Sequence, residues 1–254
     1  MNKRRTVVWH TPDISADGLK NFACIMMLMQ TIGIAVLENG LIHIDAYTQE
    51  SLSLAMGEDS RLMMLAGIAS VLQLLGGMAV PIFSFLLVEG FLRTSNYKCY
   101  FIRLLAFAVL SEAVYDLAVY GKLWDLSGQN ALFSMAVSLL MLYFLRMVQE
   151  KKGAAGILLR LLIVGSGVFW VSLLRANCGL CVVLLTAVFY LLYGKNTWKT
   201  ILGILISLLY VTGPLAFYGI WCYNEVRKNK IPGYAYYLFY PLHLLLLGGI
   251  SVIL

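Results

Sequence analysis

Long apolar runs alternate with short polar stretches along almost the whole chain. A helix that crosses the hydrocarbon core of a bilayer needs about 20 predominantly apolar residues. The runs predict about eight such spans, at Phe22–Leu37, Leu62–Leu92, Tyr100–Tyr120, Ala131–Met147, Ile157–Leu174, Cys178–Tyr193, Trp198–Trp221 and Tyr234–Leu254. We therefore expect an all-α, polytopic integral membrane helical bundle. A single transmembrane domain would fill residues 1–254 and start with a polar, cytoplasmic segment, residues 1–18.

The second apolar run is too long for one straight span. It contains Gly76-Gly77 and, shortly after them, Pro81. Because proline lacks the backbone N–H and clashes with the preceding turn, this predicts a kinked or broken helix near the middle of the run. Irregular backbone at membrane depth persists only where it is buried in protein or lines a cavity. The expected break is therefore a first indication of a site.

The composition indicates that lipid is the solvent. Of the 254 residues, 61% are hydrophobic and only 13% are charged, whereas soluble domains are about half apolar and about a quarter charged. The net charge is +6, but the basic residues flank the apolar runs, as at Lys3–Arg5, Lys151–Lys152 and Arg227–Lys230. Membrane proteins carry their orienting charge at such positions. The basic balance therefore reflects topology and argues against nucleic acid as a partner.

Loop charges predict the orientation in the cell membrane. The basic start of the chain places the N-terminus in the cytoplasm. The loop Glu38–Arg61 has five acidic residues and one basic residue and falls outside under this count, while Lys151–Lys152 and Lys195 fall inside. The basic segment Asn224–Lys230 also lands outside, against the rule. Either one span is miscounted or these charges serve another purpose.

Cysteines give no framework of disulfides or metal ligands. Cys178-x-x-Cys181 has the spacing of a redox or metal half-site, but no second pair and no nearby histidine completes it in the sequence. We interpret both as small apolar residues at the start of a span, and we expect no metal site.

Ionisable and amide side chains inside apolar runs are candidates for function, because a charge near the bilayer centre costs several kcal/mol. The carboxylates Glu112 and Asp116 are four residues apart and share one helix face. They repel each other unless a cation or a proton lies between them, as in general acid–base sites. The alternative is a network of interhelical ion pairs that holds the bundle together.

Arg103, Glu89, Gln129 and Asn130 are the next candidates. Arg103 precedes Glu112 by nine residues, about half a turn out of phase on a helix, so we expect it to meet a group on another helix. Glu89 lies four residues before Arg93 and can pair with it. Gln129-Asn130 opens the fourth run.

His243 is the sharpest single candidate. It lies in the last run, within Tyr240-Pro241-Leu242-His243. A neutral imidazole is the usual proton carrier near neutral pH, and Pro241 perturbs the helix beside it. The alternative is a hydrogen-bonded structural histidine. His10 and His43 lie in polar stretches and are expected to be solvated.

Short motifs in a fixed order run through most of the chain: Asp17–Ala23, Pro81–Phe91, Tyr100–Leu104, Ser111–Leu117, Gln129–Phe133 and Tyr237–Leu244. In this order the chain resembles the TraX family, bacterial membrane proteins that are linked to N-acetylation of pilin subunits. That family is part of a broader group of transmembrane acyltransferases.

The resemblance implies transfer of an acetyl group from acetyl-CoA, as a co-substrate, to an acceptor at or across the membrane, with no permanently bound cofactor. It implies His243 as the base or a positioning group. In a rebuilt site, the Glu112/Asp116 pair would act with His243 as further catalytic residues. Arg103 would hold an anionic part of the donor, since guanidinium suits phosphate. Gln129 and Asn130 would donate hydrogen bonds, and Glu89 and Tyr240 complete the candidate binding residues.

The chain departs from the family pattern at several positions. An Asp-His pair is expected at the end of the first motif, where this chain has Gln30 and Thr31. An arginine is expected shortly before the proline of the second span, where this chain has Gly77. An acidic residue expected before the sixth span is Asn177. A threonine hydroxyl cannot replace a histidine as base near neutral pH.

Three functions follow from these observations. The first is an acyltransferase with a rebuilt site, and the second is a catalytically impaired relative that binds a lipid, a peptide or a partner protein. The third is a small-molecule transporter. We expect membrane lipids as partners and a surface glycan, a lipid or a peptide as the acyl acceptor, with the oligomeric state open.

Overall fold

The computed structural model describes residues 13–226 and 232–254, and within these ranges the chain is helical without a β-strand. The helices are α1 (Ala16–Thr31), α2 (Gln49–Glu58), α3 (Ser60–Gly76), α4 (Ala79–Arg93), α5 (Tyr97–Tyr120), α6 (Ala131–Met147), α7 (Gly153–Leu173), α8 (Gly179–Leu191), α9 (Asn196–Ser207), α10 (Ala216–Trp221) and α11 (Gly233–Ile253). A π-helical segment, η1 (Ile32–Ile42), continues α1, and short 3₁₀ turns lie at Ile44–Ala46 (η2) and Gly213–Leu215 (η3). The predicted all-α membrane bundle is confirmed.

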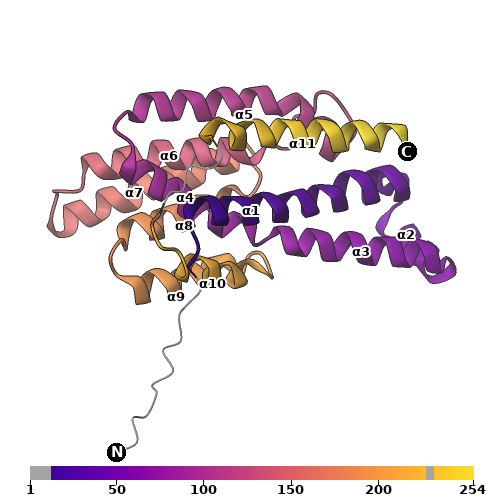
Figure 1. The fold of residues 1–254 in the computed structure, drawn as a ribbon, viewed down its shortest axis with the longest axis horizontal. Coiled ribbons are helices and arrows are strands. Elements are labelled where there is room, and N and C mark those ends of the chain that lie inside the picture. The colour runs from indigo at the N-terminus through magenta and orange to yellow at the C-terminus, as the bar shows by residue number, and fades with distance from the viewer. Residues whose placement is uncertain (1–12, 227–231) are drawn as a thin grey trace, which may run out of the picture.

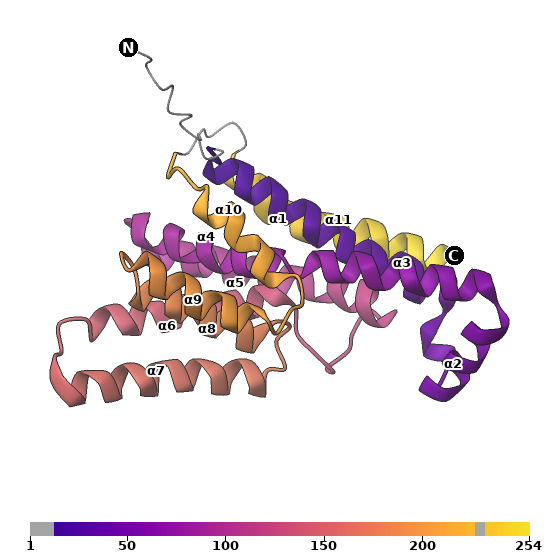
Figure 2. The same cartoon turned by 90° about the horizontal axis from the view of Figure 1, so that it is seen from below.

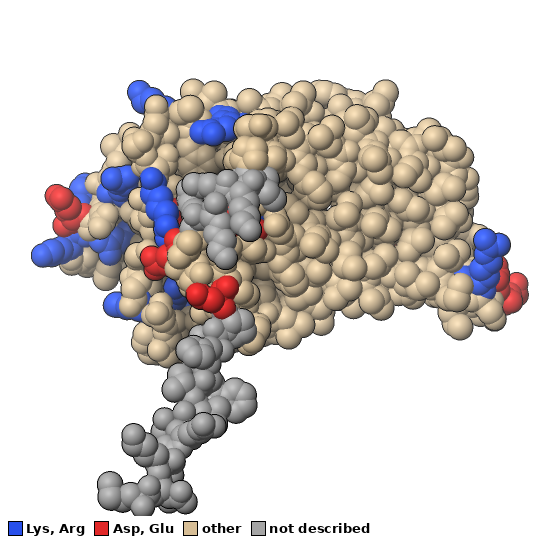
Figure 3. Space-filling view, in the orientation of Figure 1, with Lys and Arg blue, Asp and Glu red and all other residues tan. Residues whose placement is uncertain are grey.

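Among the described residues, four helical stretches are long and apolar enough to cross a membrane: Ala16–Ile42, Ser60–Arg93, Gly153–Leu173 and Gly233–Ile253. The long helices run along the longest axis of the molecule (Figure 1). On the face shown in Figure 3, the charged side chains gather at the two ends of this axis, and a wide uncharged belt separates them. Many large apolar side chains are exposed in this fold, including Ile102 at 64% and Leu161 at 64%. Since a soluble protein rarely exposes such a continuous apolar surface, the belt is the face toward lipid.

The break in the second apolar run is present where the sequence predicts it. Helix α3 ends at Gly76, and α4 begins at Ala79 with Pro81 in its first turn. At the break, the carbonyl of Leu74 accepts from the N–H of Gly77 at 3.1 Å and also from the hydroxyl of Thr212, just before η3. A Cβ at Gly77 would lie 2.9 Å from that hydroxyl oxygen, so glycine permits the close approach.

The seventh apolar run does not form one span. It divides into α9, with 12 residues, and α10, with 6 residues. At about 1.5 Å per residue, α9 measures about 18 Å, short of the hydrocarbon thickness of about 30 Å. Turns at Leu208–Leu215 connect the two helices, so that α9 and α10 run as a hairpin whose two ends lie at the same end of the bundle (Figure 2).

This hairpin accounts for the loop that breaks the charge rule. Backbone bonds join Ile14, just before α1, to Cys222 and Asn224, just after α10. Glu225 pairs with Arg93 at the end of α4. The described part of the Asn224–Lys230 segment therefore lies at the same end of the bundle as the start of α1. The charge rule failed there because the seventh apolar run was counted as one full crossing.

Helix α4 forms the centre of the bundle. Ten of its positions are buried, and it packs against α1, α6, α8 and α10. Helix α11 lies along α5 and η1, while α7 packs chiefly on α6 and α8 (Figures 1 and 2).

The connection between α5 and α6 returns along α5 instead of leaving the bundle directly. The backbone N–H of Asp125 donates to Asp116 Oδ2 at 2.9 Å, and Asn130 reaches the carbonyl of Ala108 at 2.8 Å. Helix α6 therefore starts well inside the bundle. The loop is also held by Asp125, whose Oδ1 accepts a hydrogen bond from the N–H of Ser127 at 2.7 Å. Hydrogen bonding from Ser127 lowers the pKa of Asp125.

Some sequence expectations fall beyond the described residues. Outside the described residues lie the basic clusters Lys3–Arg5 and Arg227–Lys230, together with His10. Cys178 and Cys181 are free, as are the other three cysteines. Among the described residues no group of three or more His, Cys, Asp or Glu side chains is arranged to hold a metal ion.

Candidate functional site

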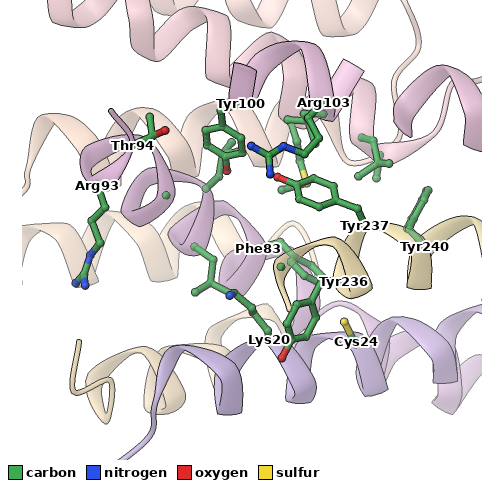
Figure 4. A pocket seen from close by; sticks show the side chains of 18 of the residues that line it. Lys20, Cys24, Phe83, Arg93, Thr94, Tyr100, Arg103, Tyr236, Tyr237 and Tyr240 are labelled. Carbon is green, nitrogen blue, oxygen red and sulfur yellow. The ribbon is translucent and has the colours of Figure 1, made fainter. Parts of the chain in front are cut away.

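A cavity of about 470 Å³ lies between α1, α4, α5, α6 and α11. This volume is within the range of about 300–1,000 Å³ that is usual for small-molecule sites. Its rim includes Thr94, Ser95 and Gly233, which lie in or beside the connections at the N-terminal end of the bundle. Three cations and four tyrosines line it: Lys20, Arg93, Arg103, Tyr100, Tyr236, Tyr237 and Tyr240 (Figure 4). None of the described residues that line it is acidic. We call it the outer cavity.

Arg103 lies on the wall that α5 forms. Its guanidinium lies over the ring of Tyr237 in α11, 5.7 Å from the ring centre, as Figure 4 shows. It thus meets a group on another helix, as its phase relative to Glu112 requires. Among the described residues, no carboxylate lies within ion-pair distance of Arg103.

The other two cations of the outer cavity have carboxylate neighbours. Lys20 lies 3.7 Å from Asp17 and 4.9 Å from the ring centre of Tyr236. Arg93 pairs with Glu89 at 2.9 Å, as their spacing predicts, and with Glu225 at 3.5 Å. Glu89 is 4% exposed and lies behind Arg93 rather than on the cavity wall.

A smaller cavity of about 90 Å³ lies deeper in the bundle. It shares part of its wall with the outer cavity, through Met27, Phe83, Ala131, Met135 and Tyr240. The two spaces therefore adjoin, with Tyr240 between them. We call the smaller space the inner cavity.

His243 and Thr31 are in contact in the wall of the inner cavity. His243 Nε2 lies 3.3 Å from the hydroxyl oxygen of Thr31, and His243 Nδ1 lies 2.8 Å from the carbonyl oxygen of Phe239. A carbonyl oxygen only accepts, so Nδ1 carries the proton in the neutral ring and Nε2 presents a lone pair. The two residues are buried, at 6% and 8% exposure, so this lone pair is shielded from bulk water.

The rest of the inner wall is largely apolar and carries a few uncharged polar groups. The side-chain amide of Asn177 donates to the hydroxyl of Tyr115 at 3.1 Å. Gln30, Ser84, Cys178 and Tyr240 are further uncharged polar residues of the wall. Because no charged residue is among the described residues that line it, His243 is the group of the inner cavity that can carry a proton near neutral pH.

The structure brings together three of the four positions where the family pattern differs. Gln30, Thr31 and Asn177 all line the inner cavity. Gly77 lies instead at the break between α3 and α4, against Tyr210 and Thr212. The departures from the family pattern thus concentrate around His243.

Glu112, Asp116 and Asn130 lie outside both cavities and connect α5 to the returning loop. Glu112 Oε2 accepts from the backbone N–H of Asn130 at 3.2 Å and from its side-chain amide. The Asn130 oxygen accepts from the N–H of Leu132 at 3.0 Å and so caps α6. One oxygen of each carboxylate, Glu112 Oε1 and Asp116 Oδ1, is buried without a hydrogen-bond partner among the described residues.

Gln129 takes part through its backbone. It pairs with Arg175 and Asn177 and so ties the start of α6 to the start of α8. This bridge fixes the position of Asn177 at the inner cavity.

Several residues of the two walls carry no distinctive signal of their own in the sequence. Lys20, Tyr100 and Tyr237 stand in the motifs quoted for the family resemblance, but at the ends of apolar runs such residues are typical interfacial anchors. Tyr115 stands one position before Asp116 and belongs to the inner wall. Tyr237 and Tyr240 are three residues apart on α11 and so share one helix face. This spacing was the sequence signal for the wall that α11 forms.

Comparisons with known proteins cover nearly the whole chain. Residues 15–251 match the sequence model of a family described as TraX protein. The chain is also 27% identical over 214 residues to a protein of Dichelobacter nodosus named probable fimbrial assembly protein FimC, serogroup H1, covering 72% of this chain and 84% of that protein. No solved structure gives a significant match.

Proposed function

The chain belongs to the TraX protein family, and from this premise we propose that it is a membrane-embedded acyltransferase that moves an acetyl group from acetyl-CoA to an acceptor at the membrane or cell surface. The observation that carries the proposal is the lone pair of His243 Nε2, shielded in a neutral inner cavity that adjoins a cationic outer cavity. A base beside a site for an anionic donor is what acyl transfer requires.

The outer cavity suits the coenzyme part of the donor. Coenzyme A carries several phosphate charges, and guanidinium and ammonium groups bind phosphate through charge-assisted hydrogen bonds. Arg103 is the best candidate, because no carboxylate among the described residues neutralises it. Lys20 and Arg93 support it from the other walls of the cavity.

The side of the membrane fits a cytoplasmic donor. The rim of the outer cavity lies at the end of the bundle where α6 ends and α7 starts, and there the connection carries Lys151 and Lys152. The positive-inside rule assigns such an end to the cytoplasm. The N-terminal end of the bundle would then face the pool of acetyl-CoA.

The inner cavity suits the reacting atoms. His243 Nε2 would take the proton of the attacking group and return it to the leaving thiolate, since both steps need one group that can hold a proton. The amide of Asn177 and the hydroxyl of Tyr240 line the same cavity and would donate hydrogen bonds to the developing oxyanion. Glu112, Asp116 and Asn130 would act as scaffold, because their contacts connect α5 to the start of α6.

The acceptor belongs to the class of amines or hydroxyls presented at the membrane. The similarity to a protein named for fimbrial assembly supports a component of a surface structure. A pilin-like peptide, a surface glycan and a lipid headgroup all present such groups.

The second candidate is a relative that binds the donor without transferring its acyl group. The neutral residues Gln30, Thr31 and Asn177 around the inner cavity favour it, because charged groups are expected there in the family. Acetyl-CoA binding without transfer would identify it.

The test uses the purified full chain in lipid nanodiscs with radiolabelled acetyl-CoA, first for binding and then for transfer to membrane components. His243→Asn keeps a short donor toward Phe239 but removes the Nε2 lone pair, and we expect it to lower the rate of transfer by about 10²–10⁴-fold with binding unchanged. His43→Asn is the matched control, because His43 is exposed in the loop beyond η1 and has a backbone conformation that asparagine also adopts. Equal transfer by both variants would remove His243 from the mechanism, and absence of acetyl-CoA binding by the unaltered protein would refute the proposed function.

A further inference from the structure

Thr31 occupies the position from which an acceptor would have to reach His243. Its hydroxyl oxygen lies 3.3 Å from Nε2, the ring atom that presents the lone pair. An incoming amine or hydroxyl must displace Thr31 before it can give its own proton to that atom. The proton that His243 can take first is therefore the proton of Thr31.

Thr31, His243 and the carbonyl of Phe239 are arranged like the nucleophile, the base and the orienting group of enzymes that form a covalent intermediate. A hydroxyl lies against a base, and a third group fixes the tautomer and orientation of that base. The same hydroxyl has an alternative acceptor in the carbonyl of Met27, at 3.0 Å. One O–H bond cannot serve both acceptors fully, so a small rotation moves the proton from the helix carbonyl to His243.

The local backbone separates this threonine from an ordinary helical one. Thr31 is the last residue of α1, and the wider winding of η1 begins at the next residue. π-helical turns are rare and are frequent at functional sites. Thr31 also borders the inner cavity, whose volume of about 90 Å³ leaves room for a group of a few heavy atoms beside the hydroxyl.

On this basis we propose that Thr31 is a nucleophile that carries the acyl group as an ester between donor and acceptor. The inference rests on the proposed function, because it names the route of that transfer. In the first step Thr31 Oγ1 bonds to the thioester carbonyl carbon, and its proton passes to His243 Nε2. The C–S bond breaks, and the coenzyme leaves as a thiolate that takes the proton from His243.

The second step reverses the roles. An acceptor amine or hydroxyl bonds to the ester carbonyl carbon and gives its proton to His243 Nε2. The bond between that carbon and Thr31 Oγ1 breaks, and Thr31 recovers the proton. His243 and Thr31 end as they began, and no oxidant or reductant is needed.

The test looks for the ester directly. The purified full chain in nanodiscs is incubated with labelled acetyl-CoA without added acceptor, quenched in acid and digested, and the peptide that contains Thr31 is sought by mass spectrometry. Treatment with alkaline hydroxylamine then distinguishes an ester, which is cleaved, from an amide on lysine, which is stable. We expect up to about one acetyl group per chain, with an equal burst of released coenzyme.

Two variants and one control separate chemistry from folding. Thr31→Ser keeps a hydroxyl and should still be labelled, while Thr31→Val keeps the shape, loses the label and lowers transfer by at least about 10²-fold. Thr186→Val is the control, because Thr186 is a fully buried threonine of α8 whose hydroxyl has no hydrogen-bond partner and which lines neither cavity.

The outcomes distinguish the inference from the function beneath it. The ester is overturned if the unaltered protein carries no label on Thr31 and the Thr31→Val variant transfers at the rate of the unaltered protein. Direct transfer through His243 would then remain. Absence of both coenzyme release and transfer by the unaltered protein overturns the proposed function and the ester with it. A labelled Thr31 peptide that loses its label on addition of an acceptor supports both.

Discussion

Removal of the charge of Arg103 is the perturbation with the most direct readout. Its guanidinium lies against Tyr237 in the outer cavity and has no carboxylate partner among the described residues. A hydrogen bond to a charged group contributes about 1.5–3 kcal/mol. Since about 1.4 kcal/mol corresponds to a tenfold change in Kd, Arg103→Gln should weaken binding of acetyl-CoA by about 10- to 150-fold.

Isothermal titration of the protein in nanodiscs measures this change. The matched control is Arg61→Gln, which removes the same charge from an exposed position in the first turn of α3, at the opposite end of the bundle. The loss caused by Arg103→Gln should shrink as salt is raised, because salt screens the attraction between guanidinium and phosphate. If Arg103→Gln binds as the unaltered protein does, or if Arg61→Gln weakens binding equally, the outer cavity is not the phosphate site.

Two further predictions concern the scaffold. Glu112→Ala removes the acceptor of the Asn130 N–H and amide groups and should lower the free energy of unfolding by about 1–3 kcal/mol, whereas Glu112→Gln keeps an acceptor and should retain transfer. A stable but inactive Glu112→Gln would instead make Glu112 a catalytic residue. Gly76→Ala places a Cβ 2.3 Å from the Gln30 Cβ and should cost about 1–3 kcal/mol, measured as a lowered Tm. Gly67→Ala in the same helix meets nothing within 4 Å and should be neutral or stabilising, and an equal loss in both would contradict the close contact.

Much of the fold was predictable because the bilayer imposes one length and one polarity on every span. The broken second run followed from Gly76-Gly77 and Pro81, which limit the backbone through local sterics. Hydrophobicity alone did not reveal the α9–α10 hairpin, because Trp198–Trp221 is apolar along most of its length. Gly213-Pro214 lies at the division, and a proline of this kind is a local sequence signal for a helix break. A tertiary contact also holds this turn, because the hydroxyl of Thr212 donates to the carbonyl of Leu74. The basic segment Asn224–Lys230, which broke the positive-inside rule, was a further sign that this run does not form one span.

The site was predictable only in part. His243 and Arg103 were identifiable because ionisable groups inside apolar runs are rare and costly. The same rule selected Glu112 and Asp116, but their contacts hold a loop that returns along α5, and no sequence period reveals such a loop. The pairing of Thr31 with His243 joins residues 212 positions apart, so it required the packing of α1 against α11.

The central claim is that the outer and inner cavities form one site for acyl transfer. A structure of the protein determined by electron cryomicroscopy in nanodiscs with acetyl-CoA tests it most directly. We expect density for the phosphates between Lys20 and Arg103 and for the thioester beside Tyr240, within reach of His243. Coenzyme bound elsewhere on the molecule, or an outer cavity filled by a lipid chain at saturating acetyl-CoA, would contradict it.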